Sequence, residues 1–552
     1  MGVVVTKKYV LPNSALICSL FALALVVTPA RQAAAQQSGQ QVVLKSWSLS
    51  WPEPREIWRI LSRDLESLGI KLEIKTGSIG ELFGQIIRKH NPYHMVTFTW
   101  GGTPDRLEPS YFLTEFFHSS RATPGGKNFG YYVNKEYDAV VDAQFEELDP
   151  QKRQILVRKA QEIIARDNVI FPVYHRDYVQ VYNSKKIKGA ISTIGSGVGF
   201  PYLPWTFLKA EPTTDLKVPR LVNRLSLKTV NPFGALNAQS TSWMKLMYDT
   251  LAKRDQNAKL IPWAAESWQR VDTTTYEVVL RGGMKFHDGK PVTVEDVKFT
   301  FDYIKKWKFP LFATTWKNVE STTIVGDRKL RLKLVRPFAP FVANILHEVF
   351  IVPKHIWKTI PESAGVANPM NWPNTVPLIG SGPYQMVERK KKEYFRLKAH
   401  KNHWIAPKFD GLYYIYIPTT EGMMAMLERD EAEIFGFTLD ASQGKKLAEL
   451  SHLTMVTAPS QGMTEIRPNV KMKPMDDPAF RRAIQHAIDR KKMLDVIFLG
   501  YGIVAHNTPI TPLLKYWNNP NIPVVEFDLD KARKILKSAG YTWDDKGRLL
   551  HP

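Results

Sequence analysis

The stretch YEVVLRGGMKFHDGKPVTVEDV, residues 276–297, carries the clearest local structure signals of this 552-residue chain. Residues 276–280 are rich in aromatic and β-branched side chains, which predicts a strand. The polar triplet HDG at residues 287–289 favours a turn. Thr293 and Asp296 have the spacing of a capping box, which predicts the start of a helix. The inward face of this helix is predicted to consist of Val297, Phe301 and Ile304.

On either side of this stretch, strand and helix patterns alternate along the chain. Strands are predicted at residues 42–49, 71–75 and 94–100, with a helix that has one apolar face at residues 57–68. This order favours a parallel sheet covered by helices. Further predicted segments are helices at 150–165, at 478–498 and between Asp528 and Gly540, a strand at 169–174, and an irregular connection at 186–219.

The first residues predict export from the cell. Lys7 and Lys8 precede an apolar run at residues 16–27, and the small residues of AAA follow, ending at Ala35. This order is typical of a Sec-type signal peptide over residues 1–35 with cleavage after Ala35. A membrane anchor is the alternative, but the run is shorter than the ~18 apolar residues that span a bilayer. We therefore expect a periplasmic protein.

The single cysteine, Cys18, lies inside this apolar run. It follows Ile17, whereas lipoprotein cleavage needs a small residue there, so we expect no lipid anchor. The chain beyond residue 35 has no cysteine, which excludes disulfides and thiolate metal sites there. That part is long enough for two or three domains.

The chain is basic, with 75 Lys and Arg against 53 Asp and Glu and a net charge of +22. These charges are scattered, which favours a generally basic solvated surface, although an anionic lipid or solute is an alternative partner. The sequence has no nucleic-acid recognition motif, so we expect no nucleic acid partner.

The common catalytic motifs are absent from the sequence. It has no H-E-x-x-H zinc motif, no G-x-S-x-G elbow, no P-loop and no G-x-G-x-x-G after a strand. The cluster GSGVG at residues 195–199 resembles a phosphate loop but does not lie between a strand and a capped helix. We therefore expect no catalytic residues, no cofactor and no metal.

Candidate binding residues follow two of the predicted strands. Trp51 comes after residues 42–49, and Trp100 ends residues 94–100. Ligands of parallel α/β sheets bind beyond the carboxyl ends of the strands. Indole walls beside opposite charges suit an amphipathic solute, whereas the alternative is core tryptophans and a solvated loop. The charged residues of the loop after Trp100 are Asp105, Arg106 and Glu108.

Several stretches resemble the family 5 extracellular solute-binding proteins of ABC importers, the peptide-binding class. The run FHDGKPVTVEDV within residues 276–297 is the most specific of them. The others are LIPWAAESW (260–268), GSGPY (380–384), DPAFRRAIQHAI (477–488), GYGIVAHNT (500–508) and KILKSAGY (534–541).

The resemblance implies an α/β fold with two lobes that are joined by a hinge. This fold is that of type II periplasmic binding proteins and is similar to their cluster C. In the family, the segment similar to residues 42–188 comes last, whereas here it comes first, so the chain resembles a circular permutation. The expected crossings of the hinge are near residues 185–189 and 464–469. The expected domains are the first part of lobe II at 42–188, lobe I at 189–463 and the second part of lobe II at 464–552.

The resemblance also implies a function. A family member of this class binds a short peptide or similar small-molecule solute between its lobes and hands it to an ABC permease in the inner membrane, as a monomer. Ser240 and Trp243 would close on the solute from lobe I. Many peptide binders of the family have an aspartate three residues after the tryptophan similar to Trp100, where this chain has Thr103. An oligosaccharide receptor and, in a different class, a secreted hydrolase stay open as alternatives.

Overall fold

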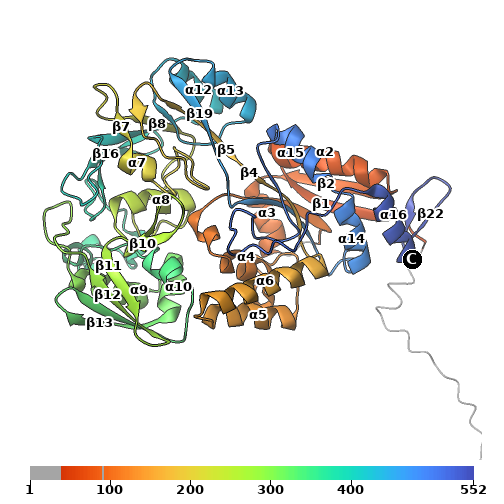
Figure 1. The fold of residues 1–552 in the computed structure, drawn as a ribbon, viewed down its shortest axis with the longest axis horizontal. Coiled ribbons are helices and arrows are strands. Elements are labelled where there is room, and N and C mark those ends of the chain that lie inside the picture. Colours follow the sequence, from red (N-terminus) through yellow and green to blue (C-terminus); the bar gives the residue numbers. More distant parts are fainter. Residues whose placement is uncertain (1–38, 90–91) are drawn as a thin grey trace, which may run out of the picture.

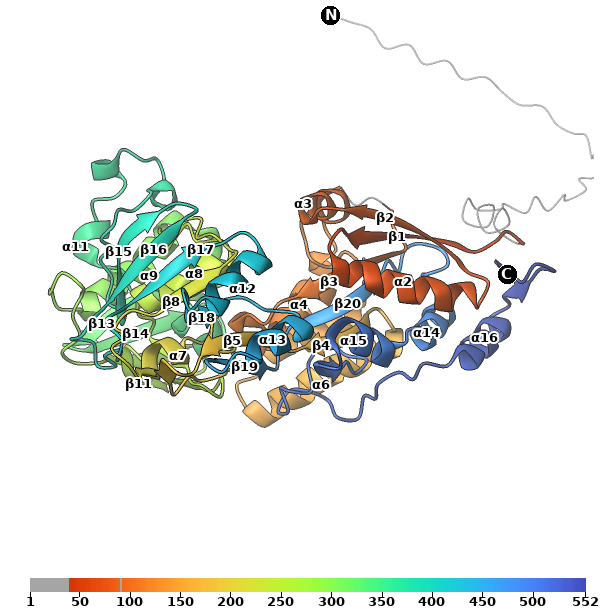
Figure 2. The same cartoon turned by 90° about the horizontal axis from the view of Figure 1, so that it is seen from above.

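The computed structural model describes residues 39–89 and 92–552. The predicted signal peptide, with Cys18, therefore lies outside the described residues. The protein has two halves that lie side by side (Figures 1 and 2). The red elements of the early chain and the blue elements of its end together form one half, which we call lobe II. The yellow to cyan elements form the other half, lobe I.

Lobe II contains a six-stranded mixed sheet. Strand β1 pairs in parallel with both neighbours, as the alternating pattern predicted. The prediction of a parallel sheet holds for these three strands, whereas β20 runs antiparallel to β3 and β4 and makes the whole sheet mixed. The spatial order of the sheet is β2 (Lys71–Gly77), β1 (Val43–Leu49), β3 (Met95–Trp100), β20 (Met463–Pro468), β4 (Phe171–Arg176) and β21 (Gly502–Val504).

Two apolar cores flank this sheet. One buries Trp58, Phe480 and Leu536, which come from both ends of the chain. The other receives alternate side chains of β3, such as Phe98, because successive strand residues point to opposite faces. The main helices around these cores are α2 (Pro52–Glu66), α4 (Ser110–Phe117), α5 (Lys135–Glu146), α6 (Pro150–Asp167), α14 (Pro478–His486), α15 (Arg490–Phe498) and α16 (Leu529–Ser538).

The first described residues of the chain pair with its last residues. The amide of Gly39 donates to the carbonyl of His551 at 3.0 Å, and the amide of Val42 donates to that of Leu549 at 2.7 Å. Gly69 ends the α2 segment at φ +79°, and a Cβ there would lie 2.2 Å from the carbonyl oxygen of Gly547. Glycine is therefore required where the two chain ends meet.

Lobe I contains a seven-stranded mixed sheet and a four-stranded antiparallel sheet around one large core. The seven-stranded sheet has the order β15 (Tyr384–Lys390), β16 (Tyr394–Ala399), β17 (Gly411–Tyr416), β8 (Arg220–Asn223), β18 (Ile434–Phe435), β5 (Tyr178–Asn183) and β19 (Leu453–Ala458). The four-stranded sheet has the order β11 (Ala265–Arg270), β12 (Thr275–Leu280), β14 (Lys329–Leu334) and β13 (Val319–Gly326).

The structure confirms the local predictions for residues 276–297. Strand β12 covers residues 276–280, and helix α9 (Val294–Trp307) begins after Thr293. The Thr293 amide donates to the Asp296 carboxylate at 2.9 Å, which closes the capping box. The three predicted inward residues are all buried: Val297, Phe301 and Ile304.

Two other predictions need correction. The single helix predicted at residues 478–498 is two helices, α14 and α15, because the Asp489 carboxylate caps a new helix by accepting the Lys492 amide at 3.0 Å. The connection at 186–219 contains helix α7 (Trp205–Lys209), whose apolar side chains are buried in lobe I.

The chain crosses between the lobes twice. Strand β4 belongs to lobe II and β5 to lobe I, so one crossing lies at Asp177. The other lies between β19 and β20, at residues 459–462. Both lie earlier in the chain than the crossings predicted near residues 185–189 and 464–469.

In the part of the chain that the structure describes, no helix has the length and apolar character needed to cross a membrane.

The remaining elements are short. They comprise α3 (Ile79–Leu82), η1 (Phe83–Arg88), η2 (Pro104–Leu107), η3 (Ser119–Arg121), β6 (Ile187–Lys188), β7 (Glu211–Pro212), α8 (Ala238–Met247), β9 (Ala252–Arg254), β10 (Leu260–Pro262), η4 (Pro310–Phe312), α10 (Ala313–Asn318), η5 (Val342–Leu346), α11 (Lys354–Trp357), η6 (Glu362–Ala364), η7 (Pro369–Asn371), α12 (Thr420–Glu428), α13 (Ala441–Ala448), β22 (Thr542–Trp543) and β23 (Leu549–Leu550).

Candidate ligand-binding site

A cavity of about 980 Å³ lies between the two lobes. Lobe II contributes η2, η3 and parts of α4 and α5, while lobe I contributes the first part of α8, η4, α10 and the segment around Arg336. This volume is at the upper end of the range of small-molecule sites in proteins. The lining includes charged side chains such as Arg106 and Lys317 as well as aromatic ones such as Tyr111 and Phe312, so it suits a solute with both polar and apolar groups.

On the lobe II side, Arg106 is held between two aromatic rings. Its guanidinium carbon lies 5.9 Å from the ring centre of Trp100 and 5.5 Å from that of Tyr111. One guanidinium nitrogen donates to the carbonyl of Gly101, whereas Nε is buried and donates to no acceptor in the described residues. The rings and the carbonyl fix the direction of a guanidinium that still has an unused donor.

The other lobe II carboxylates of the cavity have partners. Glu115 pairs with Arg121 at 2.8 Å and lies 3.8 Å from Lys127. Asp142 lies 3.4 Å from Nε2 of His118. These groups therefore neutralise one another across the cavity wall.

On the lobe I side, one face of α8 meets the cavity. The face repeats at i, i+3, i+4 and i+7, and Asn237 caps the helix by accepting the Ser240 amide at 3.0 Å. Lys245 ends this face, donates to Glu348 at 2.9 Å and lies 3.2 Å from Nε2 of His347. The residues of this face are Ala238, Thr241, Ser242 and Lys245.

Two more buried cations, Lys253 and Arg254, lie behind Lys245. Lys253 donates to the Lys245 carbonyl at 3.3 Å, and burial lowers its pKa to about 8. The pKa of His347 is well below its ordinary value because of burial, with the charges of Lys245, Arg254 and Lys253 acting in the same direction. The electrostatic potential at this wall is therefore positive.

The lobes touch at the edge of the cavity through a contact that we call the latch, formed by residues 145–146 and 336–339. Phe145 of α5 stacks on Phe338 with 5.8 Å between ring centres. The Ala339 amide donates to the Phe145 carbonyl at 2.6 Å, and Arg336 pairs with Glu146 at 3.2 Å. Both phenylalanines also line the cavity.

The lobes also meet near the two chain crossings. Nε2 of Gln461 donates to the carbonyls of Gly102 and Thr103, both at 2.9 Å. A Cβ on Gly102 would lie 2.7 Å from the Cα of Gly195. Gly195 therefore serves close packing of the backbone between the lobes, whereas Gly197 and Gly199 pack against Gln180 and Phe435 within lobe I.

Of the predicted site residues, Asp105 and Arg106 line the cavity. Trp100 lies beneath Arg106 and donates to Glu465 at 2.7 Å, while Glu108 is buried in an ion pair with Arg153. Neither side chain is part of the cavity wall.

The other three predicted residues lie away from the cavity wall. Trp51 precedes α2 and is 37% exposed. Ser240 is buried, and Trp243 packs in the lobe I core with 5.1 Å to Phe395 between ring centres. Trp243 points away because it lies on the opposite face of α8 from Lys245. The sequence argument missed the cavity-facing side of α8, where the polar residues Thr241, Ser242 and Lys245 at i, i+1 and i+4 were the available signal.

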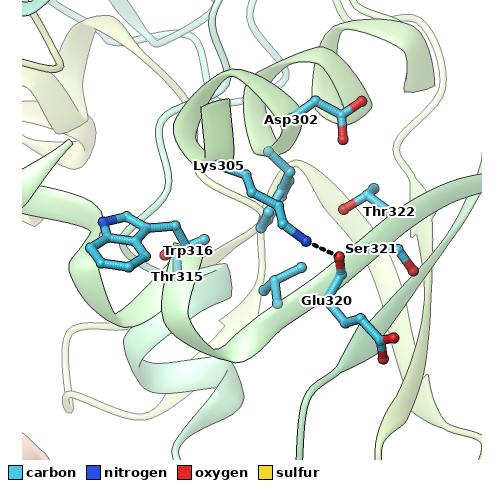
Figure 3. Close-up of a pocket in the computed structure, with 9 residues that line it drawn as sticks. Asp302, Lys305, Thr315, Trp316, Glu320, Ser321 and Thr322 are labelled. Carbon is cyan, nitrogen blue, oxygen red and sulfur yellow. Dashed lines mark hydrogen bonds between the residues drawn. The ribbon is translucent and has the colours of Figure 1, made fainter. Parts of the chain in front are cut away.

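A second pocket is much smaller. It has a volume of about 10 Å³ between α9, α10 and β13. Figure 3 shows Lys305 donating to the main-chain carbonyl of Glu320 beside it. This pocket has room for about one water molecule. Within the described residues, no group of three or more His, Cys, Asp or Glu side chains is arranged to hold a metal ion.

Residues 259–551 match the family model described as bacterial extracellular solute-binding proteins, family 5 Middle. The chain belongs to this family. Among its curated relatives, the oligopeptide-binding protein AppA of Bacillus subtilis is 30% identical over 313 residues, 55% of this chain and 56% of that protein. The glutathione-binding protein GsiB of Pectobacterium atrosepticum is 29% identical over 326 residues, 57% of this chain and 59% of that protein.

The similarity to solved structures extends over a comparable share of the chain. The structure of AppA from Bacillus subtilis in complex with a nonapeptide has a TM-score of 0.48 and 27% identity, and it covers 59% of this chain and 64% of that chain. The alignments with AppA and GsiB thus span less than two thirds of the length of these two relatives. Residues 42–188 lie outside the match to the family model.

Proposed function

We propose that this protein is the substrate-binding receptor of an ABC importer, which binds a short peptide or peptide-like solute between its lobes and delivers it to a permease in the inner membrane. The observation that carries this proposal is the cavity of about 980 Å³ that both lobes line. Membership in a family of extracellular solute-binding proteins supports the same function.

The proposed mechanism is closure of the lobes around the solute. A solute that contacts η2 and α4 of lobe II and α8 of lobe I at once binds the closed form more tightly than the open form. The two crossings, at Asp177 and residues 459–462, would act as the hinge. Opening at the permease would break the latch and release the solute.

The remaining parts of the proposal concern the chain as a whole. We propose export to the periplasm by the signal peptide at residues 1–35, a monomeric state, and binding without chemical change of the solute. We also propose that lobe II consists of residues 42–188 and 464–552 and that lobe I consists of residues 189–463. The permuted order of these segments is part of the same proposal. The crossings at Asp177 and residues 459–462 support ends of the first two segments that lie somewhat earlier in the chain.

A mixed peptide pool tests the proposed function. The full chain is incubated with the pool, and mass spectrometry then compares the bound and free fractions. We expect one retained peptide per chain, unchanged in mass. Cleaved products would indicate a hydrolase, and retention of oligosaccharides but not peptides from a parallel glycan pool would indicate a sugar receptor; either result contradicts the proposal.

A further inference from the structure

We propose that the solute carries net negative charge and presents at least two carboxylates. One would contact Arg106 in lobe II, and the other would contact the wall of lobe I that contains Lys245 and Lys317. This inference rests on the proposed function, because it concerns the same cavity. It assigns the solute to acidic peptides or peptide-like polycarboxylates.

The charges of the lining favour an anion. Six Lys and Arg side chains line the cavity, against four Asp and Glu. Three of the four carboxylates, Glu115, Asp142 and Glu348, are within ion-pair distance of a lysine, arginine or histidine of the protein. Only Asp105 is in no ion pair among the described residues, so few acceptors are left for a cationic solute.

The cations, in contrast, are not all matched. No carboxylate in the described residues lies within the 4.0 Å ion-pair distance of Arg106 or Lys317. The interaction of Asp105 with Arg106 is electrostatic attraction alone, without a hydrogen bond between the two side chains. Lys317 is exposed at the end of α10, with its Nζ 5.4 Å from the ring centre of Trp316. One unmatched cation therefore lies on each side of the cavity.

Arg106 has the properties of an anion site. The two aromatic rings and the Gly101 carbonyl hold its guanidinium in one orientation, and the buried Nε has a free donor. Guanidinium groups bind carboxylates through two parallel hydrogen bonds. Arg106 is partly exposed and lines the cavity, so a carboxylate of the solute would contact the accessible part of the guanidinium and supply the counter-charge that the described residues do not.

The opposite wall adds positive potential from groups that do not touch the cavity. Lys245 is matched by Glu348, but Lys253 and Arg254 lie behind it and are 3% and 6% exposed. Within the described residues, Asp249 is the fully buried carboxylate near Lys253, and it also contacts His403 and Trp263. An ammonium end of a solute would be repelled at this wall, and a carboxylate would be attracted.

Selection by charge is tested with three peptides of equal length that differ only in Glu, Gln or Lys at two positions. Binding of each to the full chain is measured by isothermal titration calorimetry at low and high salt. We expect the Glu peptide to bind at least about tenfold more tightly than the Gln peptide, with an affinity that falls as salt rises. We expect the Lys peptide to bind most weakly.

Variants of Arg106 and Lys317 test whether each of these cations contacts a carboxylate of the solute. Arg106→Gln and Lys317→Gln should each reduce the preference for the Glu over the Gln peptide by about tenfold or less. Lys298→Gln is the matched control, because Lys298 is paired with Asp302 on α9 and does not line the cavity. Circular dichroism checks that each variant is folded.

The outcomes separate the inference from the proposed function. Equal affinity for the three peptides, or a preference unchanged in Arg106→Gln and Lys317→Gln, would overturn the inference and leave the peptide receptor standing. Binding of none of the three peptides, together with no retention from the mixed pool, would overturn both.

Discussion

Lobe II is assembled from two distant parts of the chain, whereas lobe I is one continuous stretch. Strand β20 enters the lobe II sheet between β3 and β4, so the centre of that sheet depends on residues more than 280 positions apart in the chain. The lobe I core forms from residues 187–434. Stability of lobe II therefore depends on contacts of high sequence separation, and that of lobe I on nearer ones.

Buried carboxylates show a second contrast between the lobes, in how far their cationic partners are exposed. Glu465 on β20 is fully buried and accepts from Arg467, which is 1% exposed, and from Trp100 of the other chain part. In lobe I, Glu433 is equally buried, but its partners Arg220 and Lys186 are partly exposed. Loss of the carboxylate charge should therefore affect lobe II more than lobe I.

The largest effect is expected for Glu465→Gln. This change leaves the Arg467 charge buried without a counter-charge, which should lower the free energy of unfolding by about 3–5 kcal/mol. Glu433→Gln is the matched control, with an expected loss of about 1 kcal/mol because water can solvate its partners. Urea unfolding measures both. Equal losses would contradict the contrast between the lobes.

A buried histidine in each lobe provides the second test. Burial lowers the pKa of His175 in lobe II and of His287 in lobe I to about 4. Between pH 4 and about 6.5 the unfolded chain binds protons that the folded chain does not, so stability should rise with pH across this range and be fully present above it. Each histidine contributes up to about 3 kcal/mol.

Urea unfolding from pH 4 to pH 7 checks this dependence. If the lobes unfold in two steps, both steps should move to higher urea concentration as pH rises. A flat profile in either step would contradict the burial of that histidine.

The smallest effects are expected at the latch. Phe338→Ala removes an aromatic stack worth about 0.5–1.5 kcal/mol and should weaken solute binding by up to about tenfold. Arg336→Gln removes an exposed ion pair and should change the affinity less, by about 1 kcal/mol at most. Calorimetry with the retained peptide measures both. A larger effect of Arg336→Gln than of Phe338→Ala would contradict the stacked contact as the main part of the latch.

Local signals predicted the elements of the fold well, because they depend on neighbouring residues. The capping box of Thr293 and Asp296 and the cap at Asp149 each lie within one helical turn. The break between α14 and α15 was missed because apolar periodicity continues across it, and only the geometry of Asp489 shows the new start. The antiparallel direction of β20 was missed because strand direction depends on distant pairing.

Part of the cavity lining lies where the sequence predicted binding residues. The rule that ligands bind beyond strand ends led to Asp105 and Arg106, which line the cavity. Trp243, which was predicted to close on the solute from lobe I, packs in the lobe I core, because the sequence does not say which side of α8 packs on that core. The latch joins residues 145–146 to 336–339, and no local pattern indicates a contact between such distant segments.

The central claim is that a solute holds the two lobes closed. Spin labels at the exposed positions Ala143 in lobe II and Thr323 in lobe I, introduced as cysteines, report the distance between the lobes by electron paramagnetic resonance. The natural cysteine, Cys18, is replaced by serine in the same protein. We expect a broad distance distribution without solute and a narrow, shorter one with the retained peptide. The same distribution in both conditions would contradict the account.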